Sequence, residues 1–157
     1  MGQGIENKEP IITPGWIIMP YKYSVGAIAS KFFIGLRDKK KITGVRCSKC
    51  NLVTVPPRSI CTECFSKLDE LVELDGKGTL LTYTVVHYAP PVEGLEPPFA
   101  YGIIQLDGAD TGFTHILGEV DLENINIGMR VEAVFDDKRQ GNILDIKYFR
   151  PLTSNLQ

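Results

Sequence analysis

The four cysteines are the residues whose type and spacing could do chemistry most directly. They form two C-x-x-C pairs, Cys47/Cys50 and Cys61/Cys64, separated by ten residues. Each pair can direct two sulfur atoms at one point, and two facing pairs make a tetrahedral four-thiolate site. Zinc suits such a site, and iron is the alternative metal. Four protein ligands leave no position for water or substrate, so the spacing predicts a structural metal.

Two disulfides are another interpretation of four cysteines. The N-terminal residues lack a basic segment followed by an apolar one, so they indicate no secretory signal and favour a cytoplasmic protein with reduced thiols. A redox C-x-x-C would need only one pair and a βαβ context. No apolar run approaches the roughly 20 residues that cross a bilayer, so we expect no membrane partner.

Length and charge narrow the function classes further. The 157 residues suffice for one ordinary domain or two small ones. An apolar fraction of 43% and a charged fraction of 23% are typical of a soluble globular protein. The net charge of −2 gives no general attraction to nucleic acid.

The segment before residue 24 is interpreted as an N-terminal arm, residues 1–23. Its second half, residues 15–23, is dense in apolar and aromatic side chains without a clear period, and it contains Trp16 and Tyr21. It could pack on its own domain or dock on a partner, because interface cores favour aromatic residues.

Residues 24–40 are predicted to contain an amphipathic helix that Ser24 caps and that ends near Arg37. Its apolar side chains form one continuous stripe, made of Val25, Ile28, Ala29, Phe32, Phe33 and Leu36. The stripe could pack on the following domain or on another chain. The apolar segment before it favours another chain, so Trp16, Tyr21, Phe32 and Phe33 are predicted partner contacts.

A basic cluster follows the helix stripe. Its members are Arg37, Lys39, Lys40, Lys41 and Arg46. The cluster could be a solvated helix end favoured by the helix dipole, a site for phosphate on a small molecule, or a nucleic-acid contact. The acidic balance of the chain argues against the last of these.

The rest of the chain predicts a small β-structure. Residues 41–70 carry the cysteines and are interpreted as a zinc ribbon, and residues 71–152 as a barrel. Five short segments alternate apolar and polar residues with period two: residues 79–88, 99–106, 113–120, 130–135 and 143–149. The predicted fold class is mostly β with an N-terminal helix, the ribbon being followed by a five-stranded barrel of the OB type. A sandwich is the alternative.

Catalytic patterns are missing from the sequence. It has no G-x-S-x-G, P-loop or G-x-G-x-x-G motif, and its two histidines, His87 and His115, lie in apolar strand patterns. A core or rim position is more typical of such histidines than general-base catalysis. The residues therefore favour a binding or scaffolding protein without a catalytic residue of its own.

The order of these motifs resembles a known family. The helix ends in Phe32-Phe33-Ile34-Gly35-Leu36, and Cys47-Ser48-Lys49-Cys50, Pro56-Pro57-Arg58 and Cys61-Thr62-Glu63-Cys64 follow. Together with Gly76-Lys77-Gly78-Thr79, this resembles acyl-CoA-associated proteins that fuse a rubredoxin-like zinc ribbon to a C-terminal OB-fold. Asn51 stands where the family commonly has glycine, and asparagine tolerates the same left-handed turn.

The resemblance implies a non-catalytic partner of a thiolase-like acyl-CoA acyltransferase, within a hetero-oligomer. The small subunit of a thiolase for aromatic acyl-CoA is the narrowest match. The thiolase would then supply the chemistry, acyl-CoA could lie at the shared interface, and the basic cluster could face CoA phosphates. A zinc-ribbon and OB-fold module that binds nucleic acid, and a stand-alone acyl-CoA binder, are the alternatives.

Overall fold

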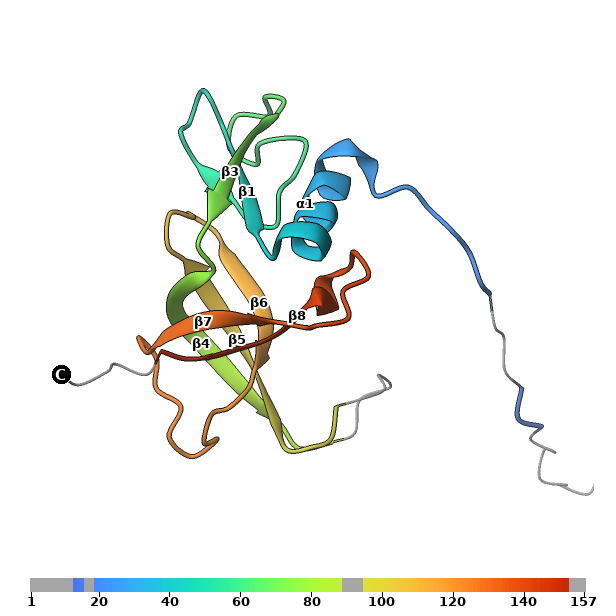
Figure 1. The fold of residues 1–157 in the computed structure, drawn as a ribbon, viewed down its shortest axis with the longest axis vertical. Helices are drawn as coiled ribbons and strands as arrows, with labels where there is room; N and C mark the ends of the chain where they lie inside the picture. Colours follow the sequence, from blue (N-terminus) through green and yellow to red (C-terminus); the bar gives the residue numbers. More distant parts are fainter. Residues whose placement is uncertain (1–12, 16–18, 89–94, 153–157) are drawn as a thin grey trace, which may run out of the picture.

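The computed structural model describes residues 13–15, 19–88 and 95–152 of the chain. Within these residues, one α-helix lies beside a small three-stranded sheet, and both sit at one end of a five-stranded barrel (Figure 1). None of the described helices is both long enough and apolar enough to cross a membrane.

The small sheet forms the ribbon. Its central strand is β1 (Ile42–Arg46), which pairs antiparallel with β2 (Val53–Thr54) on one side and with β3 (Glu70–Leu74) on the other. The two cysteine loops leave this sheet between β1 and β2 and between β2 and β3. The sheet thus presents both C-x-x-C pairs at one end of the molecule.

The barrel is closed, with strand order β4-β5-β6-β8-β7. Neighbouring strands pair antiparallel except β6 and β8, which are parallel. In β5, buried and exposed residues alternate from Gly102 to Leu106, as a half-buried strand requires. The strands are β4 (Lys77–Val86), β5 (Phe99–Leu106), β6 (Gly112–Leu117), β7 (Arg130–Phe135) and β8 (Ile146–Pro151). The predicted ribbon followed by an OB-type barrel is confirmed.

The helix α1 (Gly26–Lys39) has Val25 and not the predicted Ser24 as its N-cap, although the Ser24 hydroxyl accepts a hydrogen bond from the Gly26 N–H at 3.3 Å. Phe32 and Leu36 are 1% and 0% exposed and belong to the same core as the barrel residues. The expectation that the stripe packs on another chain is therefore wrong for these two side chains. Phe32 has no surface left for a partner.

Hydrogen bonds tie the ribbon to the barrel through the loop between β5 and β6. The carboxylate of Asp110 accepts from the Val53 N–H at 2.7 Å, and the Asp110 N–H donates to the Val53 carbonyl at 2.9 Å. The Thr111 hydroxyl accepts from the Val55 N–H at 2.8 Å and donates to the Val55 carbonyl at 2.9 Å. We call these four bonds the clasp.

The connection between β7 and β8 differs from the prediction. Residues 143–145, expected to begin a strand, form the 3-10 helix η1 (Ile143–Asp145). Asn142 caps it through a bond from the Leu144 N–H, and the buried Asp145 carboxylate accepts from the N–H groups of Gln140 and Gly141, each at 2.8 Å. These local side-chain bonds compete successfully with strand pairing.

Candidate metal centre and its surroundings

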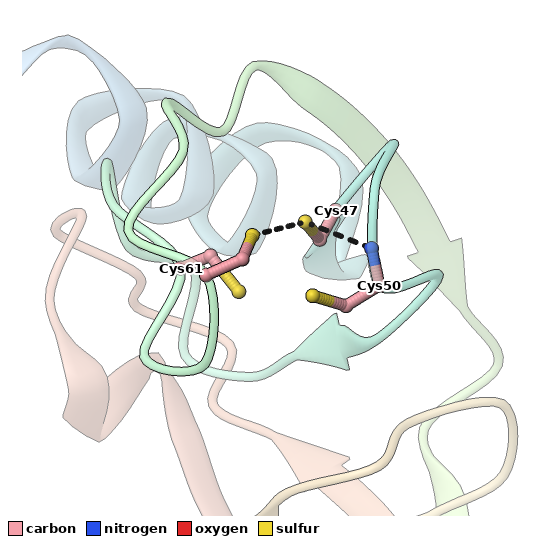
Figure 2. A group of neighbouring side chains, drawn as sticks. Cys47, Cys50 and Cys61 are labelled. Atoms are coloured by element: carbon pink, nitrogen blue, oxygen red, sulfur yellow. Dashed lines mark hydrogen bonds between the residues drawn. The ribbon is translucent and has the colours of Figure 1, made fainter.

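The structure brings the four cysteines together. Their sulfur atoms lie within 4.8 Å of one another, and the side chains of Cys47 and Cys61 are buried. Figure 2 shows the two cysteine loops facing each other with the labelled side chains turned toward a common centre. Local spacing alone was enough to find this cluster, because each C-x-x-C pair is a single turn.

The first cysteine loop, which we call the first knuckle, spans residues 47–52. The Cys47 N–H donates to the Leu52 carbonyl, and the Asn51 N–H donates to the Cys47 carbonyl, each at 2.8 Å. Asn51 has φ of 59°, so it takes the left-handed turn predicted for it. The Arg46 guanidinium donates to the Asn51 side-chain oxygen at 2.9 Å, which fixes that turn further.

The second knuckle, residues 61–66, repeats this pattern. The Cys61 N–H donates to the Ser66 carbonyl at 2.9 Å, and the Phe65 N–H donates to the Cys61 carbonyl at 3.2 Å. Phe65 has φ of 56° and occupies the position of Asn51. The two knuckles are therefore equivalent in backbone and different in side chain.

Hydrogen bonds tune the thiols before any metal binds. The Ser66 hydroxyl lies 2.9 Å from the Cys64 sulfur and 3.5 Å from the Cys47 sulfur. This contact, with the Cys50 N–H, lowers the pKa of Cys47 to about 6, and Ser66 also lowers the pKa of Cys64. The neighbouring Cys64 thiol and burial raise the pKa of Cys50 to about 12. Metal ions bind the deprotonated thiolates, so binding at this centre would release the protons that these thiols carry.

The donor set fits a tetrahedral metal. Four thiolates about 2.3 Å from a zinc ion would stand about 3.8 Å apart, and Cys47 and Cys64 have their sulfur atoms 3.6 Å apart. Zinc and iron both accept this arrangement. The four cysteines would hold the metal as a staple between the knuckles, and the choice of zinc is a proposal.

The structure disperses the predicted basic cluster. Arg37 pairs with Asp38 at 2.7 Å, and Arg46 lies 3.6 Å from Glu70. Lys40 is exposed at the end of α1 with φ of 53°. Lys39 and Lys41 instead line a groove of about 350 Å³ together with Lys31, which was not predicted as part of the cluster. Lys31 precedes Lys39 by eight residues on the helix, and this spacing could have indicated that the two lysines share a face.

The predicted partner residues also separate. Trp16 lies outside the described residues. Tyr21 is 78% exposed on the chain that runs away from the body ahead of α1 (Figure 1), and Phe33 is partly buried beside a groove of about 380 Å³. Tyr23 and Ile34, which were not predicted as partner contacts, also line this groove and are 74% and 47% exposed. The available signal was their position, because Tyr23 belongs to the apolar and aromatic segment before the helix and Ile34 follows Phe33.

The two histidines lie apart. His87 is exposed just beyond β4, off the predicted strand face. His115 is buried inside the barrel between Phe113 and Phe149, and its Nε2 is 3.3 Å from the Ile143 carbonyl. Burial lowers the pKa of His115, so its ring is neutral near pH 7.

Comparison with known proteins places this architecture in a family. Two family models match, "ChsH2, rubredoxin-like zinc ribbon domain" at residues 37–70 and "ChsH2, C-terminal OB-fold domain" at residues 71–136. A "DUF35 domain-containing scaffold protein" of Methanocaldococcus jannaschii is 35% identical over 122 residues, 74% of this chain and 86% of that protein. Its namesake in Pyrococcus furiosus is 31% identical over 127 residues, 78% of this chain and 92% of that protein.

Solved structures agree with these matches. The "Ltp2-ChsH2(DUF35) aldolase" has a chain that superposes with a TM-score of 0.62 at 24% identity, covering 83% of this chain and 98% of that one. A Sulfolobus solfataricus protein of the DUF35 family gives 0.56 at 28% identity, covering 69% and 78%. The chain belongs to the DUF35 family of scaffold proteins, with a ChsH2-type zinc ribbon and OB-fold. The predicted family resemblance is confirmed, while its narrowest form, a thiolase for aromatic acyl-CoA, stays a prediction.

Proposed function

We propose that this protein is the non-catalytic accessory subunit of a thiolase-like acyl-CoA acyltransferase. The observation that carries the proposal is the closed four-thiolate centre in a chain of the scaffold family. Such a centre holds the ribbon and offers no coordination site to a substrate. The catalytic subunit then performs the acyl transfer, and this chain braces it.

Exposed apolar side chains support docking at the ribbon end of the molecule. Met19, Tyr21 and Tyr23 are 75%, 78% and 74% exposed, and the rings of Tyr21 and Tyr23 have their centroids 5.8 Å apart. Val25 and Ile34 continue this apolar surface along α1. A catalytic subunit that covers it would bury side chains which the isolated chain leaves in water.

The groove of Lys31, Lys39 and Lys41 is our proposed contact for CoA phosphates. Its one carboxylate, from Glu73, is 3.7 Å from the Lys41 ammonium and half-exposed, so positive charge remains in excess. Thr43 also lines the groove, and the three ammonium groups there are the donors that a phosphate would meet.

The nucleic-acid alternative has less support. The outer face of β4, β5 and β6 forms a shallow cavity of about 310 Å³ lined by neutral residues, among them Thr82, Tyr101 and Ile103. Single-stranded nucleic acid needs cations beside such aromatic residues.

Purification of the tagged full-length chain from cells that make it tests the proposal. We expect a thiolase-like subunit in a fixed ratio, identified by mass spectrometry and reproduced when the two purified proteins are mixed on a sizing column. Co-purification of nucleic acid, or the absence of any stoichiometric enzyme subunit, would overturn it.

Calorimetry with CoA separates the role of the lysine groove. We expect CoA to bind the complex more tightly than this chain alone, and Lys41→Gln to weaken that binding while Lys138→Gln, at an exposed loop position, does not. Equal binding by the isolated chain would favour a stand-alone acyl-CoA binder.

A further inference from the structure

The two knuckles place different side chains at one backbone position. The residue that follows the second cysteine adopts the left-handed conformation in both, with φ of 59° at Asn51 and 56° at Phe65. Asparagine visits this region readily, because its short polar side chain bonds locally. A bulky aromatic residue there is an outlier, because its Cβ crowds the following carbonyl.

Within the described residues, little packing offsets the cost of Phe65. Its side chain is 77% exposed, so the ring gains little from packing on its own protein. The metal-binding turn would form with less strain if glycine or asparagine stood there. A strained and exposed apolar residue at one site indicates a function outside the isolated fold.

The neighbours of Phe65 indicate what kind of surface receives it. Ile60, 48% exposed, lies in the same loop, which its bridge to Lys67 closes. A groove of about 490 Å³ lies between the start of α1 and the residues that flank the second knuckle on either side in the chain, and Val25 at its edge is 44% exposed. The groove carries charges of both signs, from Arg58, Lys67 and Asp69.

Apolar side chains surrounded by mixed charges are the anatomy of a protein–protein interface, with an apolar centre and a polar rim. This groove also adjoins the apolar surface that begins at Tyr23 and Val25. The residues that flank the second knuckle therefore line a groove next to the surface assigned above to the catalytic subunit.

We propose that Phe65 is the anchor by which the ribbon docks into an apolar pocket of that catalytic subunit, an inference that rests on the proposed function. The four thiolates hold the turn that presents the ring, so little conformational freedom is lost when it inserts. The first knuckle, with its polar tip of Ser48, Lys49 and Asn51, lies outside the contact.

Two matched variants of the full-length chain test this assignment. Phe65→Gly removes the ring and relieves the turn, so we expect unchanged metal content, an unchanged or higher melting temperature, and a dissociation constant for the catalytic subunit raised about tenfold or more. Asn51→Gly makes the equivalent backbone change in the first knuckle, and we expect it to leave binding unchanged.

The outcomes separate the two proposals. If the wild-type chain binds no thiolase-like subunit, both fall. If it binds one and Phe65→Gly binds equally well, the anchor alone is overturned. If light scattering shows a dimer of the wild-type chain alone that Phe65→Gly dissociates, the ring joins two copies of this protein, and the assignment to the catalytic subunit is wrong.

Discussion

The tip of the ribbon buries four residues around its sulfur atoms, Val45, Cys47, Cys61 and Leu68, whereas the barrel encloses a continuous set of aliphatic and aromatic side chains. Two of the four buried residues at the tip are themselves candidate metal ligands. A core this small cannot offset the conformational entropy of two loops. One end of the chain would then depend on metal coordination and the other on apolar burial, so each end should fail for its own reason.

Loss of the metal should produce the largest effect and confine it to the tip. Cys47→Ser removes one of four thiolates, and structural zinc sites contribute about 10–16 kcal/mol at neutral pH. We expect the variant to lose its metal and the amide signals of residues 45–68 to lose dispersion, while the barrel signals persist. Ser48→Ala, at the adjacent exposed position, is the control. If Cys47→Ser kept the metal content and the melting temperature of the wild type, the structural role of the metal would be contradicted.

Truncation of a side chain inside the barrel should destabilise the barrel and leave the metal centre intact. Phe149 is 0% exposed and its ring packs against Phe113 with centroids 6.0 Å apart. Phe149→Ala should lower the free energy of unfolding by about 3–5 kcal/mol, measured by urea denaturation, with metal content unchanged. Leu144→Ala, at a side chain that is 59% exposed, should cost less than about 0.5 kcal/mol. Similar losses for both variants would remove the distinction between core and surface.

Breaking the clasp should weaken the barrel and the metal centre together, because the clasp couples the two ends. Asp110→Ala removes the acceptor of the buried Val53 amide, and an unsatisfied buried donor costs about 1–3 kcal/mol. We expect this loss in urea denaturation together with weaker metal retention against a chelator, because β2 carries the chain from one knuckle to the other. Asp137→Ala, at an exposed position after β7, should change neither measurement. Metal retention that stays at the wild-type level would show that the two ends are independent.

Acid should weaken the barrel by a smaller amount. The pKa of His115 is lowered by burial, so below about pH 6.5 the unfolded chain takes up a proton before the folded chain does. Stability is therefore lost as the pH falls below 6.5, by at most about 1.4 kcal/mol per pH unit. Melting temperatures from pH 7 to pH 5 should fall less steeply for His115→Phe than for wild type. His87→Gln, at the exposed histidine, should keep the wild-type slope.

The parts that the sequence predicts are those whose determinants are local or periodic. The C-x-x-C turns, the left-handed Asn51 and the five-stranded barrel followed from spacing and alternation. The burial of Phe32 did not, because the helix stripe reveals an apolar face and not the surface that covers it. The clasp was missed for a related reason, since Asp110 and Thr111 have the composition of an ordinary turn. The strand predicted to begin at residue 143 was wrong for residues 143–145, because three hydrogen bonds to the side chains of Asn142 and Asp145 outweigh the apolar strand pattern.

The clasp has a consequence for recognition. Its four bonds join positions more than 50 residues apart in sequence, and the Arg139 guanidinium adds a fifth tie by donating to the Arg37 carbonyl at 2.7 Å. The ribbon, the helix and the barrel are therefore fixed relative to one another before any partner binds. A protein that contacts all three gives up no entropy to arrange them, so more of its contact energy remains as affinity.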